Sequence, residues 1–208
     1  MAKNNNQGKN YAALLEQLLR EESIRGKHLL LHSCCAPCSS YVLEYLSDYF
    51  TITVFYYNPN ITDQEEYELR LAQQQRLAAA MNQNARYPIR VMPGPYEPER
   101  FLAFAAGLAD CPEGGERCFA CYHIRLAAAA KAAVNLGADY FTTTLTISPL
   151  KNAEKINEIG RQIADQQGIA FLPSDFKKKN GYRRSVELSE QYGLYRQNYC
   201  GCEYSKRG

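Results

Sequence analysis

Short apolar runs alternate with helical stretches along nearly the whole sequence, and this alternation constrains the fold more than any other feature. Because the runs are short and continuous, five of them are predicted to be buried strands: HLLLHS (28–33), TITVFYY (51–57), YPIRVMP (87–93), DYFTTTL (139–145) and GIAFLP (168–173). Helical stretches between the strands imply parallel pairing with right-handed crossovers. We therefore predict an α/β, Rossmann-like domain with three layers, a parallel sheet of about five strands and a cysteine-containing C-terminal tail.

Apolar stripes and capping signals place the helices between these strands. Thr62 and Glu65 fit a capping box that opens a helix running to about Met81. Ser148 followed by Pro149 is typical of an N-cap and the first helical position. The expected helices span residues 11–22, 39–50, 62–81, 97–106, 119–136, 148–168 and 185–192.

The chain has 208 residues, which suits one ordinary domain. Without an internal repeat or linker, residues 11–208 are expected to form a single α/β catalytic domain after a disordered polar leader, residues 1–10. The leader lacks the apolar segment of a signal peptide, and no apolar run approaches the ~18 residues of a membrane span. We therefore expect a cytoplasmic monomer with no membrane partner.

Seven of the eight cysteines fall into three short motifs. Thiols stay reduced in the cytoplasm, so clustered cysteines indicate metal binding or redox chemistry rather than a disulfide framework. The motifs are Cys34-Cys35-Ala36-Pro37-Cys38, Cys118-Phe119-Ala120-Cys121 and Cys200-Gly201-Cys202, and Cys111 stands apart from them. The first motif directly follows the first predicted strand, at the edge where parallel sheets bind their ligands.

The first two motifs offer two sets of four metal ligands. Cys34 and Cys35 with Cys118 and Cys121 would suit a [4Fe–4S] cluster. The two C-x-x-C pairs, 35–38 and 118–121, would suit a four-cysteine zinc site. Spacing alone does not separate these options, and some of these cysteines could instead be small buried apolar residues.

The third motif favours redox chemistry. A disulfide between Cys200 and Cys202 would close a very tight ring, and strained disulfides are the labile, catalytic kind. Metal-binding thiols and unpaired tail thiols remain as alternatives.

A basic segment with one aromatic residue lies between the last predicted strand and the tail. Five cations flank Tyr182 within eight residues: Lys177, Lys178, Lys179, Arg183 and Arg184. Such a segment could bind phosphates while Tyr182 stacks on a base, and Arg196 and Lys206 add charge nearby. A solvated charge run is the alternative, since a net charge of +2 neither requires nor excludes nucleic acid.

Polar residues also follow the second and fourth predicted strands. Asn58 and Asn60 follow the second strand, and Thr143, Thr144 and Lys151 lie near the end of the fourth. These side chains could line the mouth of a pocket and offer amide, hydroxyl and ammonium donors to a substrate. Capping of the loops is the alternative role.

The sequence resembles the QueH-type epoxyqueuosine reductase family from about residue 28 to residue 205. The resemblance rests on HSCCAPCSSYVLEYL (32–46), YYNPNI (56–61), EEYELR (65–70), RCFACYHIRL (117–126), FTTTLTISPLKN (141–152), DFKKKNGYRRS (175–185) and LYRQNYCGCEYS (194–205). It implies a cobalamin-independent oxidoreductase that reduces the epoxide of epoxyqueuosine in tRNA to queuosine. The implied partners are tRNA carrying epoxyqueuosine and an electron donor that the sequence does not identify.

The resemblance also implies roles for the cysteines. The cluster ligands would be Cys34, Cys35, Cys118 and Cys121, holding [4Fe–4S], and Cys200 and Cys202 would be a redox-active pair. One additional iron ion beside the cluster belongs to the same expectation, with Cys38 as a possible neighbour. The chemistry agrees, because opening an epoxide takes two electrons and a dithiol that becomes a disulfide releases two.

Two other functions are compatible with parts of the sequence. A zinc-stabilised RNA-binding module without catalysis would explain the C-x-x-C pairs and the basic segment, but not Cys200-Gly201-Cys202. An ATP-dependent tRNA-thiolating enzyme would explain the alternating strands. That enzyme needs a glycine-rich phosphate loop after the first strand, where this chain has SCCAPCS.

Overall fold

The computed structural model describes residues 9–205, so most of the predicted polar leader lies outside the described residues. The sheet is parallel throughout and has the strand order β3-β2-β1-β4-β5. Its strands are β1 His28–His32, β2 Thr51–Tyr56, β3 Ile89–Pro93, β4 Tyr140–Thr143 and β5 Ala170–Phe171. The predicted α/β fold with five parallel strands is confirmed.

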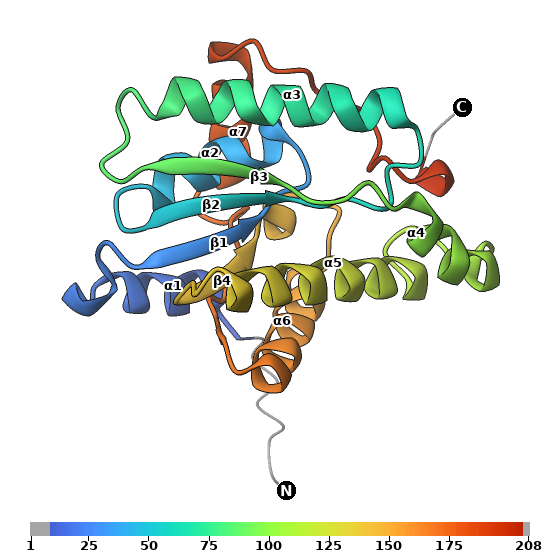
Figure 1. The fold of residues 1–208 in the computed structure, drawn as a ribbon, viewed down its shortest axis with the longest axis horizontal. Coiled ribbons are helices and arrows are strands. Elements are labelled where there is room, and N and C mark those ends of the chain that lie inside the picture. Colours follow the sequence, from blue (N-terminus) through green and yellow to red (C-terminus); the bar gives the residue numbers. More distant parts are fainter. Residues whose placement is uncertain (1–8, 206–208) are drawn as a thin grey trace, which may run out of the picture.

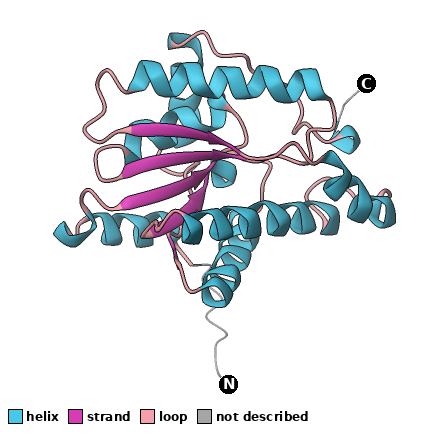
Figure 2. Cartoon of the chain, in the orientation of Figure 1, coloured by secondary structure: helices cyan, strands magenta, loops and turns pink. Residues whose placement is uncertain are grey.

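Helices cover both faces of the sheet (Figure 1, Figure 2). One face carries α1 Tyr11–Leu19, α2 Ala36–Leu46 and α3 Gln64–Met81, with α7 Gly181–Gln191 packed on α2. The other face carries α5 Glu116–Asn135 and α6 Ala153–Gln167, while α4 Pro98–Ala105 lies between β3 and α5 along the chain. Within residues 9–205, no helix is long and apolar enough to cross a bilayer.

Strand β1 is buried on both faces and anchors the site. Leu29 and Leu31 pack into the apolar cluster under α2 and α3, whereas Leu30 packs into the cluster under α5 and α6. Successive strand residues point to opposite faces, so a continuous apolar run fills both clusters. The direction in which the chain leaves the sheet after His32 is therefore fixed by packing on both sides.

Two helices begin at residues other than the predicted caps. Helix α3 begins after Asp63, whose carboxylate accepts a backbone amide hydrogen bond at 3.2 Å, so the predicted cap at Thr62 was wrong. Helix α6 begins after Asn152, whose side chain accepts one at 3.0 Å, and not at residues 148–149. Asp and Asn are at least as good N-caps as Thr and Ser, so these neighbours take the role.

The contact between α6 and β5 gives a test of the packing. A Cβ atom on Gly160 would lie 2.5 Å from Cζ of Phe171, whose ring is held against Phe141 at 5.1 Å between centroids. We expect Gly160→Ala to lower the free energy of unfolding by about 1–3 kcal/mol, because overpacking outweighs the better helix propensity of alanine. Denaturant unfolding monitored by circular dichroism measures this change.

The control for that substitution is Gly107→Ala, because no heavy atom lies within 4 Å of its Cβ position. This variant should be as stable as the parent protein. A Gly160→Ala variant of parental stability would contradict the close packing of α6 on the sheet.

Candidate functional site

The site lies where the strand order reverses. Strands β1 and β4 are neighbours in the sheet although more than a hundred residues separate them, and ligands of such sheets bind beyond the carboxyl ends of this pair. The segment after β1 is the Cys34-Cys35 turn, and the segment after β4 is a 3₁₀ helix, Thr144–Ile147. The Cys34 amide donates a hydrogen bond to Thr144 Oγ1 at 3.3 Å, which joins the two segments.

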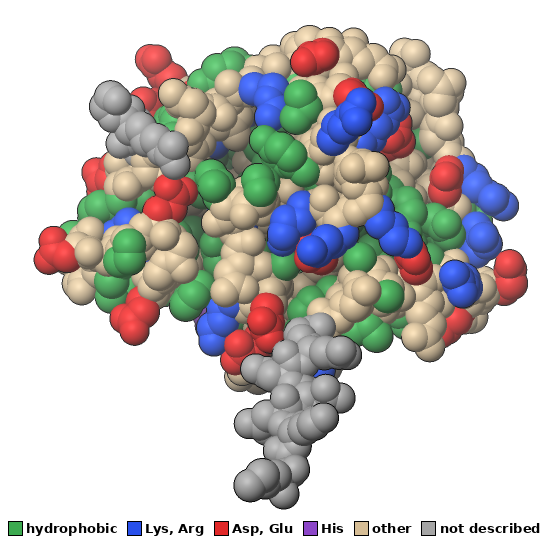
Figure 3. All heavy atoms as spheres, turned by 180° about the vertical axis from the view of Figure 1, so that it is seen from behind, with side chains coloured by type: hydrophobic (Ala, Val, Ile, Leu, Met, Phe, Trp, Pro, Cys, Tyr) green, Lys and Arg blue, Asp and Glu red, His purple; other side chains and the backbone are tan. Residues whose placement is uncertain are grey.

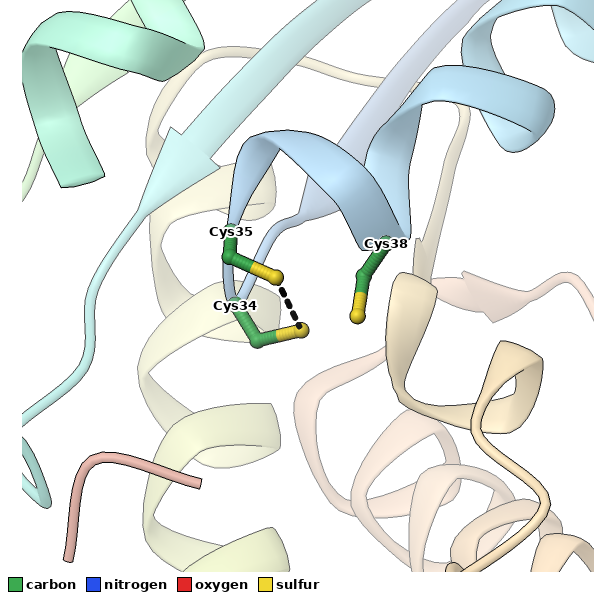
Figure 4. Close-up of side chains that lie close together, drawn as sticks. All are labelled: Cys34, Cys35 and Cys38. Atoms are coloured by element: carbon green, nitrogen blue, oxygen red, sulfur yellow. Dashed lines mark hydrogen bonds between the residues drawn. The ribbon is translucent and has the colours of Figure 1, made fainter. Parts of the chain in front are cut away.

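Three cysteines of the first motif point toward one another at this edge (Figure 4). The sulfur atoms of Cys34, Cys35 and Cys38 all lie within 4.8 Å of one another, and the first two are 3.9 Å apart. Helix α2 begins at Ala36, so Cys38 occupies its first turn and faces back toward the strand end. Within residues 9–205, no other group of three His, Cys, Asp or Glu side chains brings its ligand atoms so close.

The three thiols are electrostatically coupled. Hydrogen bonds from the thiols of Cys35 and Cys38 hold the pKa of Cys34 well below its ordinary value. The same contacts with Cys34 raise the pKa of Cys35 to about 12 and raise that of Cys38 well above its ordinary value. This arrangement stabilises one thiolate, and a metal would displace the remaining protons because only thiolates are ligands.

A buried glutamine holds both ends of the cysteine loop. Gln74 Oε1 accepts hydrogen bonds from Ser33 Oγ at 2.7 Å and from Ser39 Oγ at 2.8 Å. These serines flank the first motif, so one side chain of α3 fixes the loop between them. Hydrogen bonds to the residues around a site keep its ligand side chains in place.

The second motif lies in the first turns of α5. Cys118 Sγ accepts a hydrogen bond from the Gly114 amide at 3.2 Å, and the buried Cys121 lies 3.9 Å from a guanidinium nitrogen of Arg125. Residues three apart on a helix share a face, so both sulfurs lie on the same side of α5. Burial raises the pKa of Cys121 to about 12, and the charge of Arg125 opposes this rise.

The three motifs line two cavities: the first motif lines only the larger, the second motif only the smaller, and Cys200 of the third motif lines both. The larger has a volume of about 300 Å³ and the smaller about 30 Å³. The larger is lined by Cys34, Cys35, Cys38, Lys151, Tyr182, Arg196, Tyr199 and Cys200. The smaller is lined by Asn60, Cys118, Cys121, Arg125, Lys151, Cys200 and Cys202. Lys151 and Cys200 line both cavities, so the cavities adjoin, whereas Cys111 lines neither.

The family comparison decides what kind of protein carries this site. The family model for "Epoxyqueuosine reductase QueH" matches residues 29–208, a range that contains all three motifs. The chain belongs to the QueH epoxyqueuosine reductase family. It is therefore an enzyme, and its similarity to curated QueH proteins extends over almost its full length.

Three QueH relatives show the extent of this similarity. "Epoxyqueuosine reductase QueH" of Streptococcus pyogenes serotype M1 is 43% identical over 207 residues, covering 98% of this chain and 81% of the relative. The protein of that name from Staphylococcus epidermidis is 42% identical over 209 residues, covering 99% of this chain and 88% of the relative. The one from Thermotoga maritima is 36% identical over 180 residues, covering 85% of this chain and 89% of the relative.

A buried arginine in this QueH family member lies beside cysteines, and within residues 9–205 it is paired with no carboxylate. Arg125 is 1% exposed and donates hydrogen bonds to Asn58 Oδ1 and His32 Nε2. Burial opposes its charge, but negative charge on Cys121 and on other nearby cysteines raises the pKa of Arg125 above its ordinary value. A buried cation needs such compensation, because an isolated charge in a protein interior is very unfavourable.

Lys151 is a second cation next to the cysteines, and it lines the smaller cavity together with Arg125. Burial lowers its pKa, but the charges of Cys200, Cys34 and Cys38 outweigh that effect and raise it. Among the ion pairs of residues 9–205, neither Lys151 nor Arg125 is paired with a carboxylate. The two cations therefore favour negative charge on the cysteines beside them.

The polar residues predicted for the pocket mouth lie at different depths. Asn58 and Thr143 are buried beneath the cysteines and already bind protein groups: Asn58 donates to a backbone carbonyl at 2.9 Å, and Thr143 contacts His32 at 2.8 Å. Asn60 and Lys151 line the cavities themselves. Substrate binding by any of these four residues stays a prediction.

The cations of the basic segment are mostly paired with acidic residues. Arg184 binds the Glu44 carboxylate through two hydrogen bonds of 2.7 and 2.9 Å, and Arg183 pairs with Glu187 at 3.1 Å. Figure 3 shows Lys and Arg side chains with acidic side chains among them on one face of the molecule. Exposed ion pairs contribute little to the stability of a protein, so these cations can exchange their carboxylate partners for phosphates. RNA binding by this segment stays a prediction. Tyr182 and Arg196 line the larger cavity directly.

Sequence reasoning missed Gln74 and Arg125. Gln74 lies in a run of three glutamines that resembles an exposed helix face, so nothing in the sequence marked it. Arg125 carried a usable signal, because it follows Cys121 by four residues and must share its side of the helix.

Proposed function

We propose that this chain reduces the epoxide of epoxyqueuosine in tRNA to queuosine. The observation that supports this most is the meeting of three cysteine motifs at two adjoining cavities in a member of the QueH family. The curated relatives carry the name of this activity. A reducible substrate group requires a store of electrons, and grouped cysteines can provide one through a cluster, a dithiol or both.

We assign Cys34, Cys35, Cys118 and Cys121 as ligands of a [4Fe–4S] cluster. Arg125 and Lys151 support this assignment, because a cation beside these cysteines favours the thiolate form that binds metal. Cys38 belongs to the tightest sulfur group, so it is the candidate ligand for an additional iron ion. When bound, such a cluster supplies single electrons and an iron ion can act as a Lewis acid.

Cys200 and Cys202 supply the two electrons that the proposed reaction consumes. Removing the epoxide oxygen consumes two electrons and two protons and leaves an alkene and water. Two thiols that join in a disulfide release the same two electrons and two protons. The pair then returns to the dithiol by exchange with an external thiol reductant, which corresponds to the unidentified electron donor.

Three residues of the larger cavity are assigned to substrate binding. The Lys151 ammonium stabilises negative charge on the oxygen as the C–O bond breaks, since a fixed cation in a closed site acts strongly on developing charge. Tyr182, which is 41% exposed at the cavity, stacks on a base of the RNA. Arg196 binds a phosphate beside it.

Anaerobic purification followed by metal and sulfide analysis tests this function. The expected result is about four iron and four sulfide per chain, with up to one further iron, together with reduction of epoxyqueuosine-containing tRNA. Cys34→Ser should lose most of the iron, because it removes one ligand of the central group. Cys111→Ser is the matched control and should keep it.

If the purified protein contained zinc but no sulfide and did not reduce the tRNA, this proposal would be wrong. The protein would then be a zinc-stabilised RNA-binding module.

A further inference from the structure

The C-terminal tail is held along one side of α3 by side chains of that helix. Arg76 donates hydrogen bonds to the carbonyls of residues 192 and 193 at 2.9 and 2.8 Å, at the point where the tail leaves α7. Further along, the Tyr195 hydroxyl contacts the Glu66 carboxylate at 3.2 Å. Residues near both ends of α3 thus hold successive parts of the tail.

Arg70 connects α3 to the tail next to the redox pair. It is 2% exposed, and its guanidinium lies 2.6 Å from Glu66 Oε1, so its charge is compensated. Another nitrogen of the same guanidinium donates to the Cys200 carbonyl at 3.3 Å, and the group also lies over the ring of Tyr199 at 5.1 Å. A planar guanidinium is suited to bind several groups in fixed directions.

A second donor and a glycine complete this contact. Asn60 Nδ2 donates to the same Cys200 carbonyl at 3.2 Å. Gly201 has a φ of +102°, and a Cβ atom there would lie 2.7 Å from Ile61 Cγ1 and 3.2 Å from Arg70 Nη1. Only glycine fits this position without strain.

These contacts bind the backbone of Cys200 and leave its thiol at the two cavities. Cys202, by contrast, is buried in an apolar cluster with Phe101, Ala105 and Cys121. Cys200 therefore lines both cavities, whereas Cys202 lines only the smaller one and is largely buried.

We propose that Arg70, Asn60 and Gly201 form a backbone clamp that positions Cys200 at the substrate cavity. The inference rests on the proposed role of Cys200 and Cys202 as the redox pair. The three clamp residues are positioning residues: they hold a carbonyl and a turn, and the two cysteines carry the chemistry.

Steady-state kinetics of clamp variants test the proposal. Gly201→Ala should lower kcat by about 10²-fold, because a displacement of about 1 Å at a reacting group has an effect of this size. The KM for tRNA and the iron and sulfide content should stay at the parental values. Arg70→Lys should retain more activity than Arg70→Met, because an ammonium can still donate to the Cys200 carbonyl.

Two further variants keep the test decisive. If Arg70→Met fails to fold because Glu66 loses its partner, the double variant Glu66→Gln with Arg70→Met removes the clamp without leaving an unpaired carboxylate. Arg76→Met is the matched control, because it releases the tail far from Cys200, and kcat should stay at the parental value.

The result distinguishes the clamp from the underlying function. Clamp variants with parental kcat, or an equal loss in Arg76→Met, would overturn the clamp while leaving the reductase proposal intact. A parent protein without reductase activity, or a fully active Cys200→Ser variant, would instead overturn the function on which the clamp rests.

Discussion

Cys200→Ser is expected to abolish turnover while the protein keeps its iron, its sulfide and its visible absorption. Cys200 lines both cavities but is not one of the four cysteines assigned as cluster ligands, so its loss leaves those ligands in place. A serine hydroxyl cannot form a disulfide, so the two-electron donor is lost. Single-turnover experiments with pre-reduced protein measure this: the parent should lose two alkylatable thiols per queuosine formed, and the variant should form no queuosine.

Cys111→Ser serves as the control in the same experiment. Cys111 lines neither cavity, so this variant should form queuosine and lose two thiols as the parent does. Queuosine formation at the parental rate by Cys200→Ser would remove the dithiol from the mechanism.

Arg125→Met is expected to weaken retention of the metal centre by on the order of 10²-fold or more, because breaking a buried charge pair costs about 3–5 kcal/mol. The guanidinium is the buried cation next to Cys121, and methionine leaves the thiolates without that counter-charge. Its hydrogen bonds to His32 and Asn58 are lost as well. The rate at which a chelator removes iron from anaerobic protein measures retention.

Two other arginine substitutions serve as comparisons for Arg125→Met. Arg125→Lys keeps the charge and should retain iron much better than Arg125→Met. Arg161→Met removes a partly buried arginine of α6 that contacts Tyr11 far from the cysteines, and it should release iron at the parental rate. Equal release from Arg125→Met and the parent would show that thiolate charge is balanced elsewhere.

The sheet could be predicted from the sequence because its signal is local. The run from residue 28 to residue 33 is apolar on both faces of the strand, and such a run is typical of parallel sheets. The position of the first cysteine motif followed from the same reasoning, since it directly follows this strand. The helix starts at Asp63 and Asn152 were missed because a neighbouring residue matched a capping pattern equally well.

Two polar residues that support the cysteine motifs could not be predicted because they depend on tertiary contacts. Arg70 and Gln74 lie within a helix, and the sequence pattern does not distinguish a buried polar residue from an exposed one, whereas the spacing of Arg125 from Cys121 did carry a signal. Cys38 shows a related difficulty. The sequence places it near the start of a helix, but only the structure shows that the first turn of α2 brings its sulfur next to Cys34 and Cys35.

The dispersed origin of the cavity walls has a consequence for biosynthesis and for handling the protein. The first sulfurs are translated early, the α5 pair follows β3, and Cys200 and Cys202 come only after β5 and α7. A nascent chain can therefore complete the pairing of β1 with β4 while the tail is still inside the ribosome. The enclosure is finished only when residues 200–202 have joined the rest of the fold, so an affinity tag belongs away from this segment, which closes the cavities.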